Sequence, residues 1–412
     1  MKVLLVSVGG TPEPIKKSIK YHEPDFIYFI CSQNRPDQKG SCSQVKDILK
    51  EVDFDPQKAE LIEIERADSF SEVFSKVIKL IHHLKKTQPN AQLLVDYSGG
   101  TKTMSVGMAL AGIEEGLNVY FVSGARPDLS KVQSGTELIH RIEVEDYMTK
   151  KFFSTAEALW QNYFYQSAAS LTEKFMQAVS EDKREKLRLL YYISKAFGLW
   201  DRFQHDLAYG ILKSYGGFGR IKKYLVILYH ISSINKQNQK TKDYFIVMDL
   251  LFNAERRAEE YRFEDAIGRI YRALELLAQI RLFKEYGIKT GEAKPEEIPE
   301  SIREEYIKKF QDEDGLLKIP LFAAHNLLYH LQDEVWKDWL PEKKKLILDF
   351  LQLRNFSFYA HGLKALGEAD FKKAIPMLGE LKEIVMRLQP ETKNFPQLPR
   401  SIKELEIKEL EF

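Results

Sequence analysis

Short apolar runs alternate with helical patterns over the first 145 or so residues, and this alternation constrains the fold more than any other feature of the chain. The runs are apolar at consecutive positions, which is typical of strands in a parallel sheet that helices cover on both faces. The clearest helical pattern is Ser71–Lys86, where apolar residues recur at spacings of three and four. We predict a doubly wound α/β domain with a mainly parallel sheet, whose ligands bind at the carboxyl ends of the strands. The predicted strands are Val3–Val8, Phe26–Ile30, Leu61–Ile64, Leu93–Val95 and Val119–Val122.

The strand pattern stops near Tyr147, and long amphipathic helical patterns continue from there to Gln389. One such pattern covers Thr155–Gln177. The stretch Asn235–Lys242 is polar and has no apolar periodicity, so it predicts a break between two helical regions. We therefore expect an all-α C-terminal region. One of its helices carries an apolar stripe made of Phe263, Ile267, Ile270, Leu274 and Leu277.

These boundaries divide the chain into three parts, in keeping with a length of 412 residues. We expect a Rossmann-like domain at residues 1–146, a helical connecting region at residues 147–240, and a helical domain at residues 241–412. Lys and Arg (61) nearly balance Asp and Glu (60), so the chain is not of the strongly basic class that coats nucleic acid nonspecifically. Any nucleic-acid site must therefore be local.

The cysteine content and the lack of long apolar stretches bear on where the protein works. Cys31 and Cys42 are too few for a disulfide scaffold or a four-thiolate metal site, and their pairing is not implied. A reducing cytosol fits this content, so we expect a cytoplasmic protein. No apolar stretch approaches the roughly 20 residues that span a bilayer, and the first residues lack the pattern of a signal peptide. We expect no membrane partner.

Two glycine-rich loops follow predicted strands and precede helical patterns. Glycines at such turns let backbone amides approach a ligand, and the helix start that follows suits a phosphate group. Neither loop matches a P-loop or a dinucleotide fingerprint, so ATP hydrolysis is not indicated. The alternative is that each loop only makes a tight turn and caps the next helix, and that Lys102 is a solvated surface lysine. The loop residues are Gly9, Gly10, Thr11 and Pro12 in the first and Ser98, Gly99, Gly100, Thr101 and Lys102 in the second.

The segments VSVGGTPEP and, more specifically, DYSGGTKTMSVGMAL make the first 145 or so residues resemble CRISPR-associated Rossmann-fold (CARF) sensor domains. The resemblance implies a homodimer that binds a cyclic oligoadenylate, either cyclic tetra- or cyclic hexa-adenylate, as an activator. It also implies that both glycine-rich loops line the ligand pocket. Gln33 and Asn34, just after the second strand, are expected to reach the same pocket.

Arg354, Asn355 and His361 stand among apolar and aromatic residues near the end of the chain. In a continuous helix, Arg354 and His361 share a face about 10 Å apart. A histidine can move a proton at the 2′-hydroxyl or the leaving oxygen of RNA, and an arginine can offset charge on phosphorus. The alternative is structural: the histidine caps the helix end and the arginine pairs with a carboxylate.

Arg-x6-His with Asn after the Arg, in an all-helical domain behind a CARF-like domain, resembles HEPN ribonucleases of type III CRISPR antiviral systems. The resemblance implies a metal-independent endoribonuclease that cuts single-stranded RNA and leaves a 5′-hydroxyl and a 2′,3′-cyclic phosphate. Arg354 and His361 of two subunits then form one composite catalytic site, with Asn355 orienting groups around it. Residues 147–240 then act as a lever between the sensor and this site.

Three other readings remain open. A non-catalytic sensor whose helical half docks a partner would tolerate loss of Arg354 or His361. A DNA nuclease is disfavoured because no acidic metal-binding cluster is visible, and the other histidines lack metal-ligand spacing, so we expect no metal or other cofactor. A side prediction is that the sensor pocket cleaves its own ring, with Thr11 or Thr101 near the bond.

Overall fold

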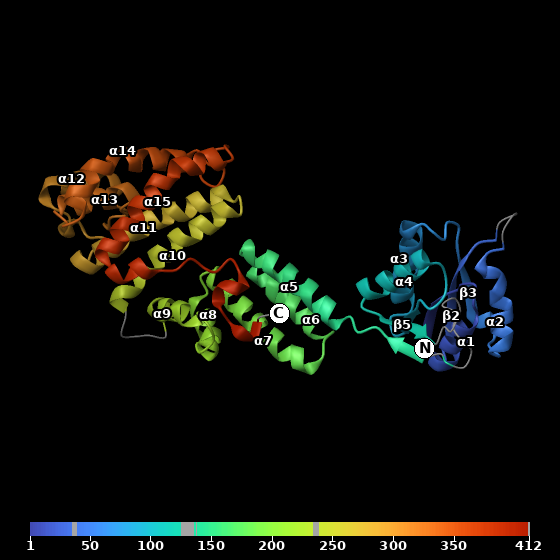
Figure 1. Ribbon diagram of the computed structural model, residues 1–412. Helices are drawn as coiled ribbons and strands as arrows, with labels where there is room; N and C mark the ends of the chain where they lie inside the picture. Colours follow the sequence, from blue (N-terminus) through green and yellow to red (C-terminus); the bar gives the residue numbers. More distant parts are fainter. Residues whose placement is uncertain (35–38, 125–135, 137, 234–238, 411–412) are drawn as a thin grey trace. The chain divides into compact units, whose positions relative to one another are not determined.

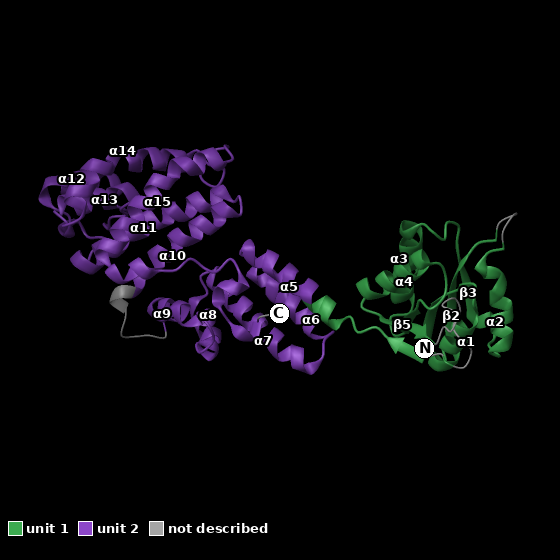
Figure 2. Ribbon diagram, in the orientation of Figure 1, with its two compact units in different colours: residues 1–149 green, residues 150–412 purple. Residues whose placement is uncertain are grey.

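The chain forms two compact units, Met1–Thr149 and Lys150–Phe412, which are described separately below (Figure 2). The predicted connecting region and the predicted C-terminal domain both fall in the second unit, apart from the first residues of the connecting region. The division at residues 240 and 241 stays a prediction. The computed structural model describes residues 1–34, 39–124, 136, 138–233 and 239–410.

The first unit is built on a six-stranded sheet in the order β3-β2-β1-β4-β5-β6 (Figure 1). All neighbouring strands are parallel except β5 and β6, which are antiparallel. The predicted Rossmann-like α/β fold with a mainly parallel sheet is confirmed. The sixth strand was not predicted, because its short sequence LIHR is half polar and contains no apolar run of the expected length. The strands are β1 (Lys2–Ser7), β2 (Phe26–Ser32), β3 (Ala59–Ile64), β4 (Gln92–Asp96), β5 (Asn118–Ser123) and β6 (Leu138–Arg141).

Helices cover both faces of this sheet, which explains why the strands are apolar at consecutive positions. Leu4 and Val6 of β1 pack in one cluster with α1 (Glu13–His22) and α2 (Val45–Glu51). Val3 and Leu5 pack on the opposite face with α3 (Phe70–Thr87) and α4 (Lys102–Glu114). Two short 3-10 helices, η1 (Ser41–Gln44) and η2 (Pro56–Lys58), complete the unit.

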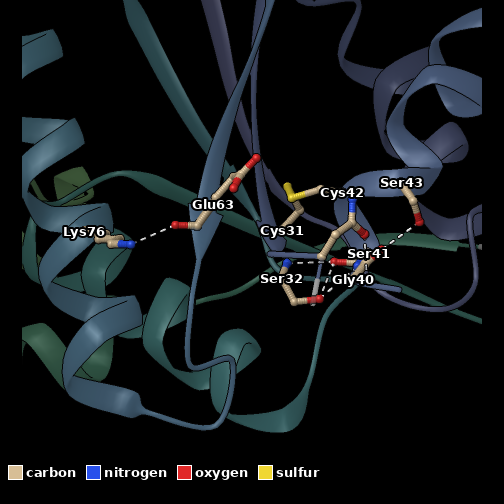
Figure 3. The surroundings of a disulfide bond; sticks show 9 residues. Cys31, Ser32, Gly40, Ser41, Cys42, Ser43, Glu63 and Lys76 are labelled. Carbon is tan, nitrogen blue, oxygen red and sulfur yellow. Dashed lines mark hydrogen bonds between the residues drawn. A yellow bond between two sulfur atoms is a disulfide. The ribbon is translucent and has the colours of Figure 1, made fainter. Parts of the chain in front are cut away.

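A disulfide joins Cys31 at the end of β2 to Cys42 in η1 (Figure 3). The cysteine count did not imply this pairing, and the structure corrects that reading. Both side chains are buried, with Cys31 0% and Cys42 8% exposed. The chain returns to β2 through two hydrogen bonds of 2.9 Å, from Ser32 N to Ser41 Oγ and from Ser41 N to Ser32 Oγ. Pairing depends on this return of the loop, which cysteine spacing alone does not reveal.

The second unit is helical, so the predicted all-α C-terminal region is confirmed (Figure 1). Its α-helices are α5 (Glu145–Gln161, starting in the first unit), α6 (Tyr165–Met176), α7 (Glu181–Trp200), α8 (His205–Leu212), α9 (Ile221–Ile231), α10 (Gln239–Glu259), α11 (Phe263–Tyr286), α12 (Glu300–Phe310), α13 (Leu321–His330), α14 (Trp336–Asn355) and α15 (Glu368–Leu388). Its 3-10 helices are η3 (Lys213–Tyr215), η5 (Pro295–Glu297), η6 (Pro390–Asn394), η7 (Ile402–Leu405) and η8 (Lys408–Leu410).

Two helical expectations need correction at their ends. The pattern over Thr155–Gln177 is not one helix, because Tyr163 has a φ of 58°, a left-handed conformation that separates α5 from α6. The polar stretch Asn235–Lys242 is partly helical, since α10 begins at Gln239. Residues 235–238 of that stretch lie outside the described residues. Polar composition therefore did not prevent helix formation over its second half.

The predicted apolar stripe of α11 packs in the helical core. Its members Ile267, Ile270, Leu274 and Leu277 are at most 1% exposed. The buried His325 of α13 packs beside this stripe and contacts the Leu274 carbonyl oxygen through Nε2 at 3.1 Å. No helix in the described parts of the chain is long and apolar enough to cross a membrane.

The last residues of the described chain return to the first helices of the second unit, as the red segment beside α5 and α7 in Figure 1 shows. The Tyr165 hydroxyl donates to the Pro399 carbonyl oxygen at 2.7 Å, and Arg220 N donates to the Leu405 carbonyl oxygen at 2.7 Å. Leu405 is fully buried. The helices before and after α10 therefore share one core.

Candidate functional sites

The two glycine-rich loops of the first unit touch at the carboxyl ends of the neighbouring strands β1 and β4. A Cβ added to Gly9 would lie 2.4 Å from the backbone nitrogen of Gly100, and one added to Gly99 would lie 2.3 Å from the Ser7 carbonyl oxygen. Real Cβ atoms do not approach backbone atoms so closely. Gly10, in contrast, has no atom within 4 Å of an added Cβ. The structure thus brings the predicted loop residues together, and Gly9 and Gly99 are required for that contact.

A buried carboxylate, Asp96 at the end of β4, holds the second loop in place. Its Oδ2 accepts from Ser18 Oγ at 2.6 Å, and its Oδ1 accepts from Ser98 N at 2.8 Å. Ser98 Oγ in turn accepts from Val122 N of β5 at 2.7 Å. Burial raises the pKa of Asp96. Asp96 was not among the predicted site residues, although an Asp two residues before a Ser at a strand end is a known signal for a turn closed by its side chain.

The predicted ligand-binding residues differ in whether other parts of the protein already bind their polar groups. Thr101 caps α4, because its Oγ1 accepts from Met104 N at 3.2 Å and also donates to the Ala67 carbonyl oxygen at 2.8 Å. The structural alternative therefore holds for Thr101. Thr11 and the exposed Lys102 have no side-chain hydrogen bond among the described residues, so their polar groups are available to a ligand. Pro12 precedes α1 as its N-cap residue.

Gln33 and Asn34 follow β2 and are both exposed at the same edge of the sheet. The backbone of Gln33 donates to the Ile64 carbonyl oxygen at 3.0 Å, which extends the pairing of β2 with β3. Asn34 Oδ1 accepts from Gly40 N at 2.8 Å. The disulfide at Cys31 lies two residues before Gln33 and fixes the start of this segment.

The continuous helix expected between Arg354 and His361 is wrong. α14 ends at Asn355, and the following residues form a compact turn. Within it, Gly362 N donates to the Ser357 carbonyl oxygen at 3.1 Å, and a Cβ on Gly362 would lie 2.0 Å from the Phe356 carbonyl oxygen. The chain therefore folds back where an unbroken helix would have continued. Apolar spacing alone did not reveal this turn.

Arg354 does not pair with a carboxylate in the described part of the chain, so the structural alternative does not hold for it. Its guanidinium carbon lies over the Tyr271 ring, 4.2 Å from the ring centre, a cation–π contact. Its Nη1 lies 3.4 Å from Asn355 Oδ1. His361 is exposed, and its backbone nitrogen, rather than its ring, contacts the helix end through the Asn355 carbonyl oxygen at 3.4 Å. Its imidazole has no hydrogen-bond partner among the described residues.

Glu264, in the first turn of α11, anchors the segment that carries His361. Its carboxylate accepts from Phe358 N at 3.3 Å, from Tyr359 N at 3.2 Å and from Leu366 N at 3.0 Å. One side chain thus binds backbone groups on both sides of His361. Glu264 was not among the predicted site residues, because it lies 94 residues before Phe358.

The turn around His361 is covered by exposed apolar and aromatic side chains, which we call the motif patch. Its members are Phe356, Phe358, Tyr359 and Leu363, which are 57%, 62%, 71% and 91% exposed. Scattered apolar side chains are normal on a protein surface, but several within eight residues of one segment are characteristic of an interface. The predicted catalytic residues therefore lie beside a surface suited to contact with another molecule.

A cavity of about 320 Å³ opens next to Arg354 in the second unit. Residues of α11, of the turn between α7 and α8, and of the segment after α14 line it, including Arg269, Arg272 and Tyr359. In the described parts of the chain, no group of three or more His, Cys, Asp or Glu side chains is arranged to hold a metal ion.

Comparisons with known proteins point to the same two regions. Residues 235–385 match the family described as the Csm6 HEPN domain, a segment that includes Arg354, Asn355 and His361. Comparison with curated protein sequences found no match. The fold is similar to that of Enterococcus italicus Csm6 bound to cyclic hexa-2′-fluoro-hexa-dAMP, with a TM-score of 0.62 and 17% identity over 95% of each chain.

Two further structures match with a TM-score of 0.25, too low to support an argument. Can2 from Sulfobacillus thermosulfidooxidans in complex with cyclic tetra-adenylate is 10% identical over 52% of this chain and 68% of its own. Protein VC1899 from Vibrio cholerae is 11% identical over 66% of this chain and 68% of its own. The HEPN match and the Csm6 fold confirm the predicted resemblance to CARF–HEPN proteins.

Proposed function

We propose that this protein is a metal-independent endoribonuclease of type III CRISPR antiviral defence, activated by a cyclic oligoadenylate and acting on single-stranded RNA. The observation that carries the proposal is that Arg354, which forms no salt bridge among the described residues, and the exposed His361 lie in one short segment beside the motif patch. Both groups are chemically competent, and neither is committed to a structural ion pair in the described residues. The HEPN family match over the same segment supports this reading.

The reaction needs only proton transfers and charge stabilisation. His361 accepts the proton of a ribose 2′-hydroxyl, or gives a proton to the leaving 5′-oxygen, while the 2′-oxygen attacks phosphorus. Arg354 offsets the negative charge that develops on the phosphoryl oxygens. The bond from phosphorus to the 5′-oxygen breaks, and the products carry a 2′,3′-cyclic phosphate and a 5′-hydroxyl. Asn355, within reach of Arg354, orients the guanidinium.

A second copy of the chain completes the site. One His361 cannot serve efficiently as base and acid at once, and the imidazole has no partner among the described residues to hold it in place. The motif patch offers the apolar surface that a symmetric contact requires. In the proposed homodimer, Arg354 and His361 of both copies face one RNA strand, so dimerisation is part of the chemistry.

The glycine-rich loops of the first unit are proposed to bind the ring. Closely packed backbone at Gly9 and Gly99, the helix start at Lys102 and the free hydroxyl of Thr11 present donors to phosphate groups at one sheet edge. Gln33 and Asn34 lie at that edge as well. The similar Csm6 of E. italicus was solved with a cyclic hexanucleotide analogue, which supports testing the six-membered ring beside the four-membered one.

The helices that follow the sensor are proposed to transmit ring binding to the RNA site. Asp201, at the end of α7, accepts from Arg256 Nε at 2.8 Å and from Arg257 Nη2 at 2.7 Å. These groups are at most 9% exposed, so the network holds the connecting helices rigidly against α10. A rigid connection favours transmission of a change in the sensor over its absorption by a flexible hinge.

The proposal is tested by incubating a fluorescent single-stranded RNA with the protein in EDTA and with cyclic tetra- or hexa-adenylate, and by analysing the ends of the products. Wild type is expected to leave a 2′,3′-cyclic phosphate and a 5′-hydroxyl, and His361→Ala is expected to leave the RNA intact. A 3′-hydroxyl product, or loss of cleavage in EDTA, would contradict the proposed chemistry. Equal activity of His361→Ala and wild type would favour a non-catalytic sensor instead.

A further inference from the structure

The cavity beside Arg354 contains more positive charge than the proposed chemistry uses. Three guanidinium groups line it, those of Arg269, Arg272 and Arg354. Two carboxylates also line it, but both are occupied: Glu264 accepts the backbone donors of the motif segment, and Asp265 pairs with Arg262 and Arg269. Three guanidinium groups and two carboxylates leave the lining with a formal charge of +1, so the cavity suits an anion.

The two additional arginines are held in fixed positions while some of their donors remain free. Arg269 uses Nε toward Asn253 and Nη1 toward Asp265, which leaves its Nη2 without a partner in the described residues. Arg272 uses Nη1 toward Glu275, which leaves Nε and Nη2 without one there. A guanidinium that is oriented by some of its N–H groups and open at the others is suited to bind phosphate oxygens.

We propose that this cavity is a subsite for an RNA phosphate adjacent to the cleaved one, with Arg272 and Arg269 as its binding residues; the inference rests on the proposed function. The volume of about 320 Å³ is of the size that one nucleotide fills. The cavity shares Arg354 with the proposed reaction site, so a strand cut at that site passes directly into it.

A subsite of this kind explains why the arginines need not take part in the chemistry. A phosphate held one nucleotide away from the reaction fixes the position of the strand and contributes equally to the ground state and the transition state. Loss of such a contact raises KM and leaves kcat unchanged. Loss of Arg354, in contrast, removes charge stabilisation at the reacting phosphate and lowers kcat.

The test uses the full-length protein with Arg272→Ala, a substitution at a side chain that is 46% exposed and not part of the core. RNA affinity is measured by fluorescence anisotropy in a His361→Ala background, which prevents cleavage, at several salt concentrations and with the ring that activates wild type. We expect Arg272→Ala to raise Kd about tenfold, as loss of a charge-assisted hydrogen bond implies. The slope of log Kd against log salt should fall by about 0.7, the value for one phosphate contact on a single strand.

Matched variants separate this subsite from general effects of charge. Arg184 also forms a surface pair with a Glu three residues away and is 37% exposed, but it does not line the cavity. Arg184→Ala should leave both Kd and the salt slope as they are. Arg272→Lys retains the charge without the fork of donors and should lie between wild type and Arg272→Ala.

Kinetic and binding measurements distinguish failure of the subsite from failure of the proposed function. In the cleaving protein, Arg272→Ala should raise KM about tenfold with kcat unchanged, and unchanged KM would overturn the subsite. Binding of adenosine monophosphate that is lost in Arg272→Ala while RNA affinity is unchanged would also overturn it, in favour of a free-nucleotide site. If wild type binds RNA with the predicted Arg272 dependence but cuts none, the subsite stands and the proposed function fails.

Discussion

The two candidate sites of this chain are built in opposite ways. The proposed ring-binding edge of the first unit consists of backbone packed against backbone, with Gly9 against Gly100 and a buried Asp96 holding the loop. The Arg354–His361 segment of the second unit is exposed, carries an apolar patch and leaves an imidazole without a partner among the described residues. The first site is preorganised within one chain, whereas the second, in the proposed homodimer, is completed only when another chain covers it. A preorganised pocket suits the proposed sensor, which must bind its ligand whenever the ligand is present. A site that needs a second chain suits the proposed nuclease, which must stay inactive until it is activated.

The largest effect is expected from placing a charge in the motif patch. Leu363 is 91% exposed, so Leu363→Asp should leave the fold intact but oppose contact between two copies. RNA cleavage should fall at least about 100-fold, the effect of losing a positioned general acid or base. Tyr261→Asp is the control, since Tyr261 is 81% exposed and lies outside the patch. Full activity of Leu363→Asp would mean that the site is complete within one chain.

The second prediction concerns the close backbone contact between the glycine-rich loops of the first unit. Gly99→Ala forces a Cβ to 2.3 Å from the Ser7 carbonyl oxygen, and the strain should destabilise the first unit by about 2 kcal/mol. Gly10→Ala meets no atom within 4 Å and should change stability by less than about 0.5 kcal/mol. Chemical denaturation of both variants, followed by circular dichroism, provides the comparison. Equal stability of the two variants would show that the loops do not need their close backbone contact.

A pH effect of similar size should be visible in the second unit. Burial lowers the pKa of His325 to about 4, compared with 6.5 for an unperturbed histidine. Below pH 6.5 the unfolded chain therefore binds a proton that the folded chain does not bind. The free energy of unfolding falls as the pH falls toward 4. From pH 7 to pH 5 this loss should be about 2 kcal/mol.

Tryptophan fluorescence can follow this transition, because all four tryptophans lie in the second unit and Trp336 Nε1 donates to His325 Nδ1 at 2.8 Å. His325→Gln should be less stable than wild type at pH 7 but should lose less stability on acidification. The same pH dependence in both proteins would assign the effect to other groups.

The smallest effect concerns the anchor of the motif segment. Glu264→Ala removes the acceptor of three backbone N–H groups around His361 and should lower kcat about tenfold, because a general acid or base works only in position. Glu264→Gln keeps one acceptor oxygen and should recover part of the rate. Glu368→Ala, a substitution in the first turn of α15, is a control for loss of a charge at a helix start. A change in KM with kcat unchanged in Glu264→Ala would argue against a positioning role.

The features predicted from sequence are those that local pattern determines. The strands β1, β2 and β4 were recognised because both of their faces are buried, which makes their residues apolar at consecutive positions. The glycine-rich loops were recognised because glycine at a strand end is required by close backbone approach, as at Gly99. Such signals are contained within a few residues of chain.

The features that were missed depend on contacts between distant segments. Glu264 could not be selected, since its role follows only from the return of the chain 94 residues later. The end of α14 at Asn355 depends on the same contact, which stabilises a turn where the sequence pattern is compatible with a helix. The pairing of Cys31 with Cys42 depends likewise on the return of the loop toward β2.

The central claim is that a ring bound by the first unit switches on RNA cleavage by the second. It is tested most directly by the rate of RNA cleavage in EDTA with no ring, with cyclic tetra-adenylate and with cyclic hexa-adenylate, for wild type and His361→Ala. We predict that one ring stimulates wild type strongly, that His361→Ala stays inactive with every ring, and that both proteins bind the activating ring equally well. Cleavage that no ring stimulates, or that His361→Ala retains, would contradict the account.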